Sequence, residues 1–268
     1  MNRPVFRTWS ARLAVAASLG LCLALASGCD KRSTSRPPSG PPSASPVKMP
    51  PPGTYSIDLF KAEPRLGTAV VVLVDTSGSM GQAVKDKAGQ KRPKHQIARE
   101  ALEHIIASTD AWKKAHPKAN LQMAMYSFNS SVSEVLPMGD FDAAKARQAL
   151  DRLPPPNSGT AIGKALEAGF KALYRSGCLR KFIVCVTDGE NTTGPPPDWI
   201  ARHLHARTEG EVELQFVAFD TSARQFDFLK EVNGHVVQAD DGARLQTELE
   251  KIYQERILVE KEEETQKK

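Results

Sequence analysis

Two patterns of hydrophobic residues alternate along most of the chain. Short continuous apolar runs predict strands, and apolar residues spaced three or four positions apart predict helices. The predicted strands lie at 69–74, 121–128, 132–136, 182–188, 212–219 and 235–238. The predicted helices lie near 97–106 and at 143–153, 162–173, 197–207, 224–232 and 241–257. The central strands are apolar on both faces, which predicts an α/β fold with a Rossmann-like open, mostly parallel sheet and helices on both faces.

Composition divides the chain into four parts. Residues 1–28 begin with three arginines and continue as an apolar stretch too short for a comfortable membrane span, which is typical of a signal peptide. Residues 29–66 are rich in proline and serine and predict an extended tether. Residues 67–256 form the predicted folded domain. Residues 257–268 are highly charged and predict a solvated helix end or tail, with a short partner-binding helix as the alternative.

The signal segment ends in LASGCD at 25–30, which resembles a bacterial lipobox. The resemblance implies cleavage before Cys29 and a lipid on its sulfur, which would anchor the protein to a membrane surface of the bacterial cell envelope, facing the periplasm or the exterior. Ala26 stands where the motif prefers leucine, so a plain secretory signal is the alternative. Cys178 and Cys185 lie up to about 20 Å apart along one predicted strand, too far apart for a disulfide.

Charge and motifs exclude several classes of function. The chain carries 36 basic and 31 acidic residues, and without its first 28 residues the count is 33 against 31, which gives no reason to expect nucleic-acid binding. It has no His-Glu-x-x-His motif, no glycine-rich phosphate loop and no Gly-x-Ser-x-Gly elbow. We therefore expect no enzyme. A metal-assisted hydrolase is the less favoured alternative, because a bound cation can act as a Lewis acid.

Polar residues stand where the predicted strands end. Asp75 follows the first strand, Ser77 and Ser79 follow on a tight loop, Asp188 ends another central strand, and Thr160 lies at the start of a helix. The carboxyl ends of parallel strands share one edge of a sheet, so these residues can converge. Oxygen ligands of this kind suit a hard divalent cation, Mg²⁺ or Mn²⁺. The alternative is that they are only caps and turn formers.

The spacing of these residues resembles the von Willebrand factor type A (VWA) domain with a metal-ion-dependent adhesion site (MIDAS). That motif reads Asp-x-Ser-x-Ser, then a distant threonine and a distant aspartate, and the resemblance covers about 68–256. It implies that Ser77, Ser79 and Thr160 contact the metal directly, and that Asp75 and Asp188 act largely through waters or hydrogen bonds. Neutral ligands leave the cation electrophilic, so a glutamate or aspartate of a partner protein would fill its open position. Some bacterial relatives instead organise a membrane or ATPase assembly, which is the second interpretation.

Two segments are predicted to border the metal site. The first is a long basic loop at 85–95, which would steer an acidic partner toward the metal. Its rim residues are Lys85, Lys87, Lys91 and Arg92. The second segment follows Asp188, where Glu190 and Asn191 are expected beside the site.

Overall fold

The computed structural model describes residues 62–259. Within this range, six strands form one sheet in the order β5-β4-β1-β6-β7-β8, and every neighbouring pair is parallel except β4 and β5. The strands are β1 (Arg65–Asp75), β4 (Leu121–Phe128), β5 (Val132–Asp140), β6 (Cys178–Thr187), β7 (Val212–Phe219) and β8 (Gly234–Ala239). The predicted signal peptide, the lipidation site Cys29 and the charged tail from residue 260 lie outside the described residues.

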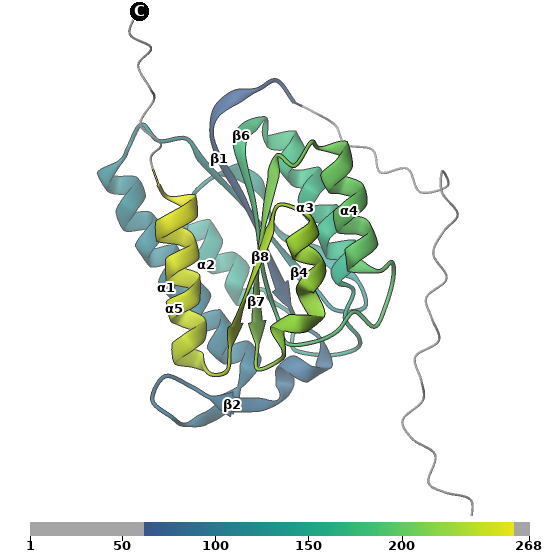
Figure 1. Ribbon diagram of the computed structural model, residues 1–268. Coiled ribbons are helices and arrows are strands. Elements are labelled where there is room, and N and C mark those ends of the chain that lie inside the picture. The colour runs from purple at the N-terminus through teal and green to yellow at the C-terminus, as the bar shows by residue number, and fades with distance from the viewer. Residues whose placement is uncertain (1–61, 260–268) are drawn as a thin grey trace, which may run out of the picture. The chain divides into compact units, whose positions relative to one another are not determined.

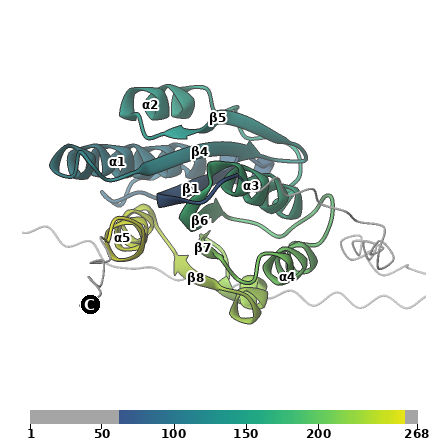
Figure 2. The same cartoon turned by 90° about the horizontal axis from the view of Figure 1, so that it is seen from above.

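Helices cover both faces of this sheet (Figures 1 and 2). One face carries α1 (Lys94–Ala115), α2 (Ala143–Asp151) and α5 (Gly242–Ile252). The other carries α3 (Ile162–Ser176), α4 (Pro197–Arg207) and the 3-10 segment η2 (Ala223–Glu231). The predicted fold class, an open and mostly parallel sheet between two helical layers, is confirmed.

Strand β1 shows why the sheet is covered on both sides. Val70, Val72 and Val74 pack among the residues of α1, α2 and α5, whereas Val71 and Leu73 pack against α3. All five are at most 3% exposed. A strand that is apolar on both faces can be stable only between two layers, so β1 lies in the middle of the sheet with its last residue at the carboxyl edge.

The predicted basic loop at 85–95 has more structure than we expected. Strands β2 (Ala83–Lys85) and β3 (Lys91–Pro93) pair antiparallel, and α1 already begins at Lys94. The side chain of Asp86 accepts hydrogen bonds from the backbone amides of Ala88 and Gln90, which closes the turn between the strands. The prediction of a long loop was therefore wrong: the segment is a hairpin followed by the first turn of a helix.

Other boundaries also differ from those predicted. Strand β5 runs on to Asp140 through Pro137, which is tolerated because β5 lies at an edge of the sheet and pairs only with β4. The predicted final helix at 241–257 is split into α5 and a π-helical turn, η3 (Tyr253–Ile257).

Both ends of the described segment lie at the amino edge of the sheet. The Ala62 amide donates to the carbonyl of Tyr174, and the Arg180 guanidinium donates to the carbonyl of Val259. In residues 62–259 no helix is long and apolar enough to cross a membrane. Cys178 and Cys185 are both buried free thiols on β6, which agrees with the prediction that they are too far apart for a disulfide.

Candidate metal centre

Asp75 lies at the buried end of β1 and is fully enclosed, at 0% exposure. Its Oδ1 accepts the Ser77 amide at 2.7 Å, and its Oδ2 accepts the Thr187 hydroxyl at 2.5 Å. Burial raises the pKa of Asp75 to about 6, although these hydrogen bonds lower it. A buried carboxylate of this kind is stabilised in its charged form by a nearby cation.

The next two serines turn toward a second carboxylate. The Ser79 hydroxyl donates to Asp188 Oδ1 at 2.6 Å, and the Oγ atoms of Ser77 and Ser79 are 3.1 Å apart. The 3-10 turn η1 (Gly78–Gly81) holds this loop in place, and the Gly78 amide donates to the carbonyl of Ser158. Because Ser158 has φ = 61°, the loop before α3 carries backbone strain at the point where it contacts the loop of Ser77 and Ser79.

Thr160 reaches the same edge from the loop before α3. Its amide donates to the Thr192 hydroxyl at 2.8 Å, and its carbonyl accepts the amides of Thr192 and Thr193. A β-carbon placed on Gly189 would lie 3.7 Å from both Ser79 Oγ and Thr160 Oγ1, so these two hydroxyls border one small space. The five residues predicted as metal ligands therefore lie together at the carboxyl edge of β1 and β6.

Two charged residues of this edge were missed by the sequence analysis. Lys94, the first residue of α1, is 3% exposed, and its Nζ lies 2.9 Å from Asp188 Oδ2 and 2.8 Å from Asp220 Oδ2. Burial lowers the pKa of Lys94, but its hydrogen bonds to Asp220 and Asp188 outweigh that effect and raise the pKa above its ordinary value. Asp220 directly follows β7, as Asp75 and Asp188 end or follow β1 and β6, and this repeated position was the signal that could have identified it.

The predicted rim residues differ in what they contact. Lys85, Lys87 and Lys91 are exposed on the β2–β3 hairpin. Arg92 is not free, because its guanidinium makes two hydrogen bonds to the Glu100 carboxylate, at 2.9 and 2.5 Å.

On the second rim segment, Glu190 is exposed. Asn191 accepts the Gly163 amide at 3.3 Å and donates to the carbonyl of Pro195 at 3.3 Å, so it joins its loop to α3. Contact of these rim residues with a partner stays a prediction.

The donor set fits a hard cation. Within residues 62–259, no group of three or more histidine, cysteine, aspartate and glutamate side chains could hold a metal, so a cation here would depend on hydroxyls. Ser77, Ser79 and Thr160 supply neutral oxygens, and Asp75 and Asp188 supply the negative charge. Oxygen ligands of this kind suit Mg²⁺ or Mn²⁺ better than the softer transition metals.

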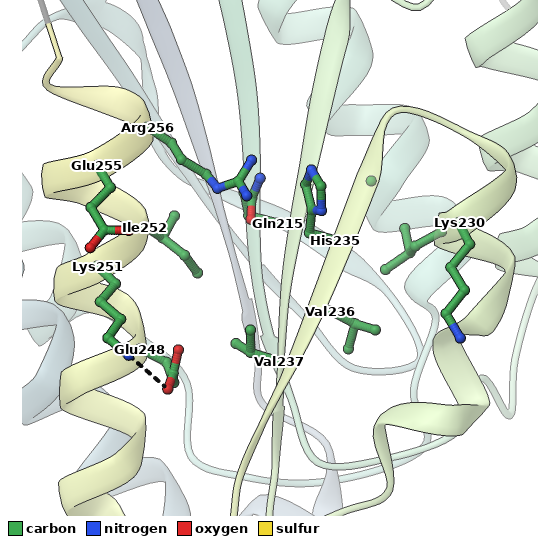
Figure 3. Close-up of a pocket in the computed structure, with 12 residues that line it drawn as sticks. Gln215, Lys230, His235, Val236, Val237, Glu248, Lys251, Ile252, Glu255 and Arg256 are labelled. Carbon is green, nitrogen blue, oxygen red and sulfur yellow. Dashed lines mark ion pairs between the residues drawn. The ribbon is translucent and has the colours of Figure 1, made fainter.

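A cavity of about 350 Å³ lies away from this edge, between α5, β7, β8 and η2 (Figure 3). Its charged side chains are largely paired within the protein: Glu248 lies 3.7 Å from Lys251, and Arg256 lies 2.8 Å from Glu213. Val236, Val237 and Ile252 also line it. This mixed lining favours no particular ligand, so the carboxyl edge remains the candidate functional site.

An open α/β sheet with a cluster of hydroxyls and carboxylates at its carboxyl edge defines a class of domains that bind ligands where the strands end. Residues 69–254 match the family model of the von Willebrand factor type A domain. That match spans more than half of the chain, and the protein belongs to this family.

Solved structures share the fold at low sequence identity. BatB from Bacteroides thetaiotaomicron is 18% identical, with a TM-score of 0.52 over 69% of this chain and 98% of that chain. The PilB minor pilin from Streptococcus sanguinis is 14% identical, with a TM-score of 0.57 over 76% of this chain and 64% of the pilin. The pilus adhesin SpaC from Lactobacillus rhamnosus GG is 14% identical, with a TM-score of 0.54 over 74% of this chain and 31% of the adhesin. This chain thus spans less than two thirds of both pilus proteins, and no curated protein sequence matches it.

Proposed function

We propose that this protein is a metal-dependent protein-binding domain displayed on the bacterial cell envelope. The observation that carries the proposal is that three loops meet at one edge of the sheet: Ser77 contacts Ser79, Ser79 donates to Asp188, and the hydroxyls of Ser79 and Thr160 border one small space. Simple helix caps would not need to meet in this way. Membership of the von Willebrand factor type A family supports a binding role rather than catalysis.

The chemistry of the proposed site follows from which ligands carry charge. Three of the five residues are neutral hydroxyls, and Asp188 already shares its charge with Lys94. A bound Mg²⁺ or Mn²⁺ would supply an incompletely neutralised positive charge with an open coordination position. A glutamate or aspartate of the partner fits that position, because a carboxylate is a hard anionic ligand.

Display on the envelope is supported by the sequence before the domain and by the position of its ends. The lipobox-like segment before Cys29 predicts a lipid anchor. The described chain enters at the amino edge of the sheet, so the point where the preceding segment joins the domain lies opposite the candidate metal centre. Among the proteins of similar fold are a membrane protein, a minor pilin and a pilus adhesin.

The binding role is tested by immobilising the full-length chain and passing an envelope extract over it with Mg²⁺ or with EDTA. We expect a partner that is retained with Mg²⁺, released by EDTA and not retained by Asp188→Asn. A partner held equally well in EDTA and by the Asp188→Asn variant would contradict the proposal, because recognition would then use another face of the domain.

The anchor is tested separately. Wild-type protein is expected to partition into detergent and to incorporate a labelled fatty acid, whereas Cys29→Ala does neither or accumulates as the precursor. Cys178→Ala is the matched control, since it removes a thiol that is buried inside the domain. Unchanged labelling of Cys29→Ala would place the attachment elsewhere.

A further inference from the structure

A lysine ammonium is buried beside the candidate metal centre. Lys94 lies at the first position of α1, where its backbone amide donates to the carbonyl of Gln82 at 2.9 Å. Its side chain is 4% exposed and makes two ion pairs, with Asp188 and with Asp220. An ammonium removed from water costs several kcal/mol unless it is paired. This residue is therefore held in place by the two carboxylates it contacts.

The two oxygens of the Asp188 carboxylate have different partners. Its Oδ1 accepts the Ser79 hydroxyl at 2.6 Å, on the side of the metal loop, and its Oδ2 binds Lys94 at 2.9 Å. A cation that approaches Ser79 and Asp188 meets a carboxylate whose charge is already partly neutralised, and it also meets the repulsion of the ammonium. Both effects oppose metal binding.

Asp220 is the second carboxylate that contacts the Lys94 ammonium. It adopts a left-handed backbone conformation, with φ = 52°, which is unfavourable for a residue other than glycine. Its side chain is 42% exposed, yet its Oδ2 lies 2.8 Å from Lys94 Nζ. Asp220 thus takes a share of the ammonium that Asp188 would otherwise have alone.

We propose that Lys94 is a positioning residue that keeps the Asp188 carboxylate partly neutralised and so lowers the affinity of the site for its cation, with Asp220 weakening this restraint. The proposal rests on the proposed function of the site as a metal centre. A metal site that is weak by itself becomes fully occupied when a partner adds a further carboxylate, which makes the metal and the partner bind cooperatively.

The test is a calorimetric titration of the full-length chain with Mn²⁺. Lys94→Met removes the ammonium and keeps an unbranched side chain only one atom shorter, so affinity for Mn²⁺ should rise about tenfold. In Asp220→Asn, only Asp188 of these two carboxylates still forms an ion pair with Lys94. The affinity for Mn²⁺ should therefore fall about threefold. Lys181→Met is the matched control, because Lys181 is 7% exposed and paired with Glu211 at the opposite edge of the sheet, and its removal should leave the affinity unchanged.

Thermal unfolding provides a second measurement that a purely structural role would not affect. Without Lys94, the metal-free protein keeps the Asp188 carboxylate buried with the Ser79 hydroxyl but without the ion pair that it has in wild type, so Mn²⁺ should raise the Tm of Lys94→Met more than that of wild type. In Lys181→Met, the Tm should fall equally with and without Mn²⁺.

The outcomes separate the two proposals. No Mn²⁺ binding by wild type would overturn the metal centre and this inference together. Binding by wild type that is weakened or unchanged in Lys94→Met would overturn the inference alone. If Lys94→Met does not fold, Asp220→Asn decides, because unchanged or increased affinity in that variant contradicts the role given to Lys94.

Discussion

Each edge of the sheet has a cationic side chain that is held by the fold, the partly buried Arg180 at the amino edge and the buried Lys94 at the carboxyl edge, but the two differ in their partners. At the amino edge, the Arg180 guanidinium donates to the carbonyls of Arg256, Ile257 and Val259 and closes the C-terminal turn. At the carboxyl edge, Lys94 donates to the Asp188 carboxylate, which also accepts the Ser79 hydroxyl. In the C-terminal turn the partners of Arg180 are backbone carbonyls, which can do little more than accept these hydrogen bonds.

This difference distinguishes a charge that only stabilises the fold, such as that of Arg180, from one that can take part in ligand binding, such as that of Lys94. A buried charge by itself indicates only that a partner is present. A carboxylate that is shared between a cation and a hydroxyl, next to further hydroxyls, can exchange its partners when a metal arrives. The carboxyl edge is therefore where we expect changes in ligand binding, and the amino edge is where we expect changes in stability alone.

The largest expected effect is at the two aspartates of the proposed metal centre. Asp75→Asn and Asp188→Asn each remove a negative charge with little change in shape, so affinity for Mg²⁺ should fall by at least about 100-fold. Calorimetry measures the affinity, and circular dichroism should show an unchanged fold. Arg180→Met, at the other edge, is the control and should bind Mg²⁺ like wild type. Equal binding by all three variants would place the metal elsewhere.

Thr160→Ala should have the next largest effect, and it should be mainly on the partner. Loss of one member of a desolvated charged contact typically costs about 2–5 kcal/mol, so partner affinity should fall roughly 30-fold or more. Surface plasmon resonance with the partner isolated on the immobilised chain measures this change. Thr208→Ala is the control, since Thr208 is 3% exposed and lies in the turn that precedes β7. A partner that binds Thr160→Ala as tightly as wild type would rule out threonine as a ligand in the bound state.

A moderate effect on stability alone is expected at the amino edge. Arg180→Met removes hydrogen bonds from a charged donor to carbonyls of the C-terminal turn, which should lower the free energy of unfolding by about 1.5 kcal/mol. Denaturant unfolding with and without Mg²⁺ should show the same loss in both conditions. A loss of stability that appears only with Mg²⁺ would show that Arg180 affects metal binding. That result would contradict the distinction between an amino edge that affects stability alone and a carboxyl edge that binds the ligand.

The smallest effect is expected at the rim. Replacing Lys85, Lys87 and Lys91 together by alanine should slow partner association roughly threefold and weaken its salt dependence, with little change in dissociation, because exposed charges act mainly on encounter. Lys118→Ala, an exposed lysine between α1 and β4, is the control. Faster dissociation of the triple variant would instead mean that the hairpin makes direct contacts in the complex. Arg92 is excluded from this set because Glu100 already holds it.

The architecture could be predicted because its signals are local. Apolar runs such as Val70–Val74 identify a strand buried on both faces, and a strand of this kind needs two covering layers. That Asp75 and Asp188 lie at one edge could be predicted for a similar reason, since each marks the end of such a run and strand ends share one edge. The hairpin of β2 and β3 escaped prediction because strands of three residues are too short to show a period.

The ion pairs of Lys94 could not be predicted, for a physical reason. Lys94 lies 94 residues before Asp188, and a lysine in a basic segment is normally solvated. Only the folded arrangement, in which α1 begins beside the ends of β6 and β7, brings the ammonium to the two carboxylates. The position of Asp220 directly after a strand was a local signal in the sequence. Nothing local indicated that Asp220 would form an ion pair with Lys94.

The loops that carry Thr160 and Asp188 are hydrogen-bonded to each other. The Thr160 carbonyl accepts two amides of the second loop, and a β-carbon on Gly163 would lie 2.2 Å from the carbonyl oxygen of Pro195. Neither loop can change its length or path without displacing the other. For anyone who wishes to redirect this domain to a new ligand, the two loops are therefore a single exchangeable cassette, and a graft that replaces one of them needs its matching counterpart.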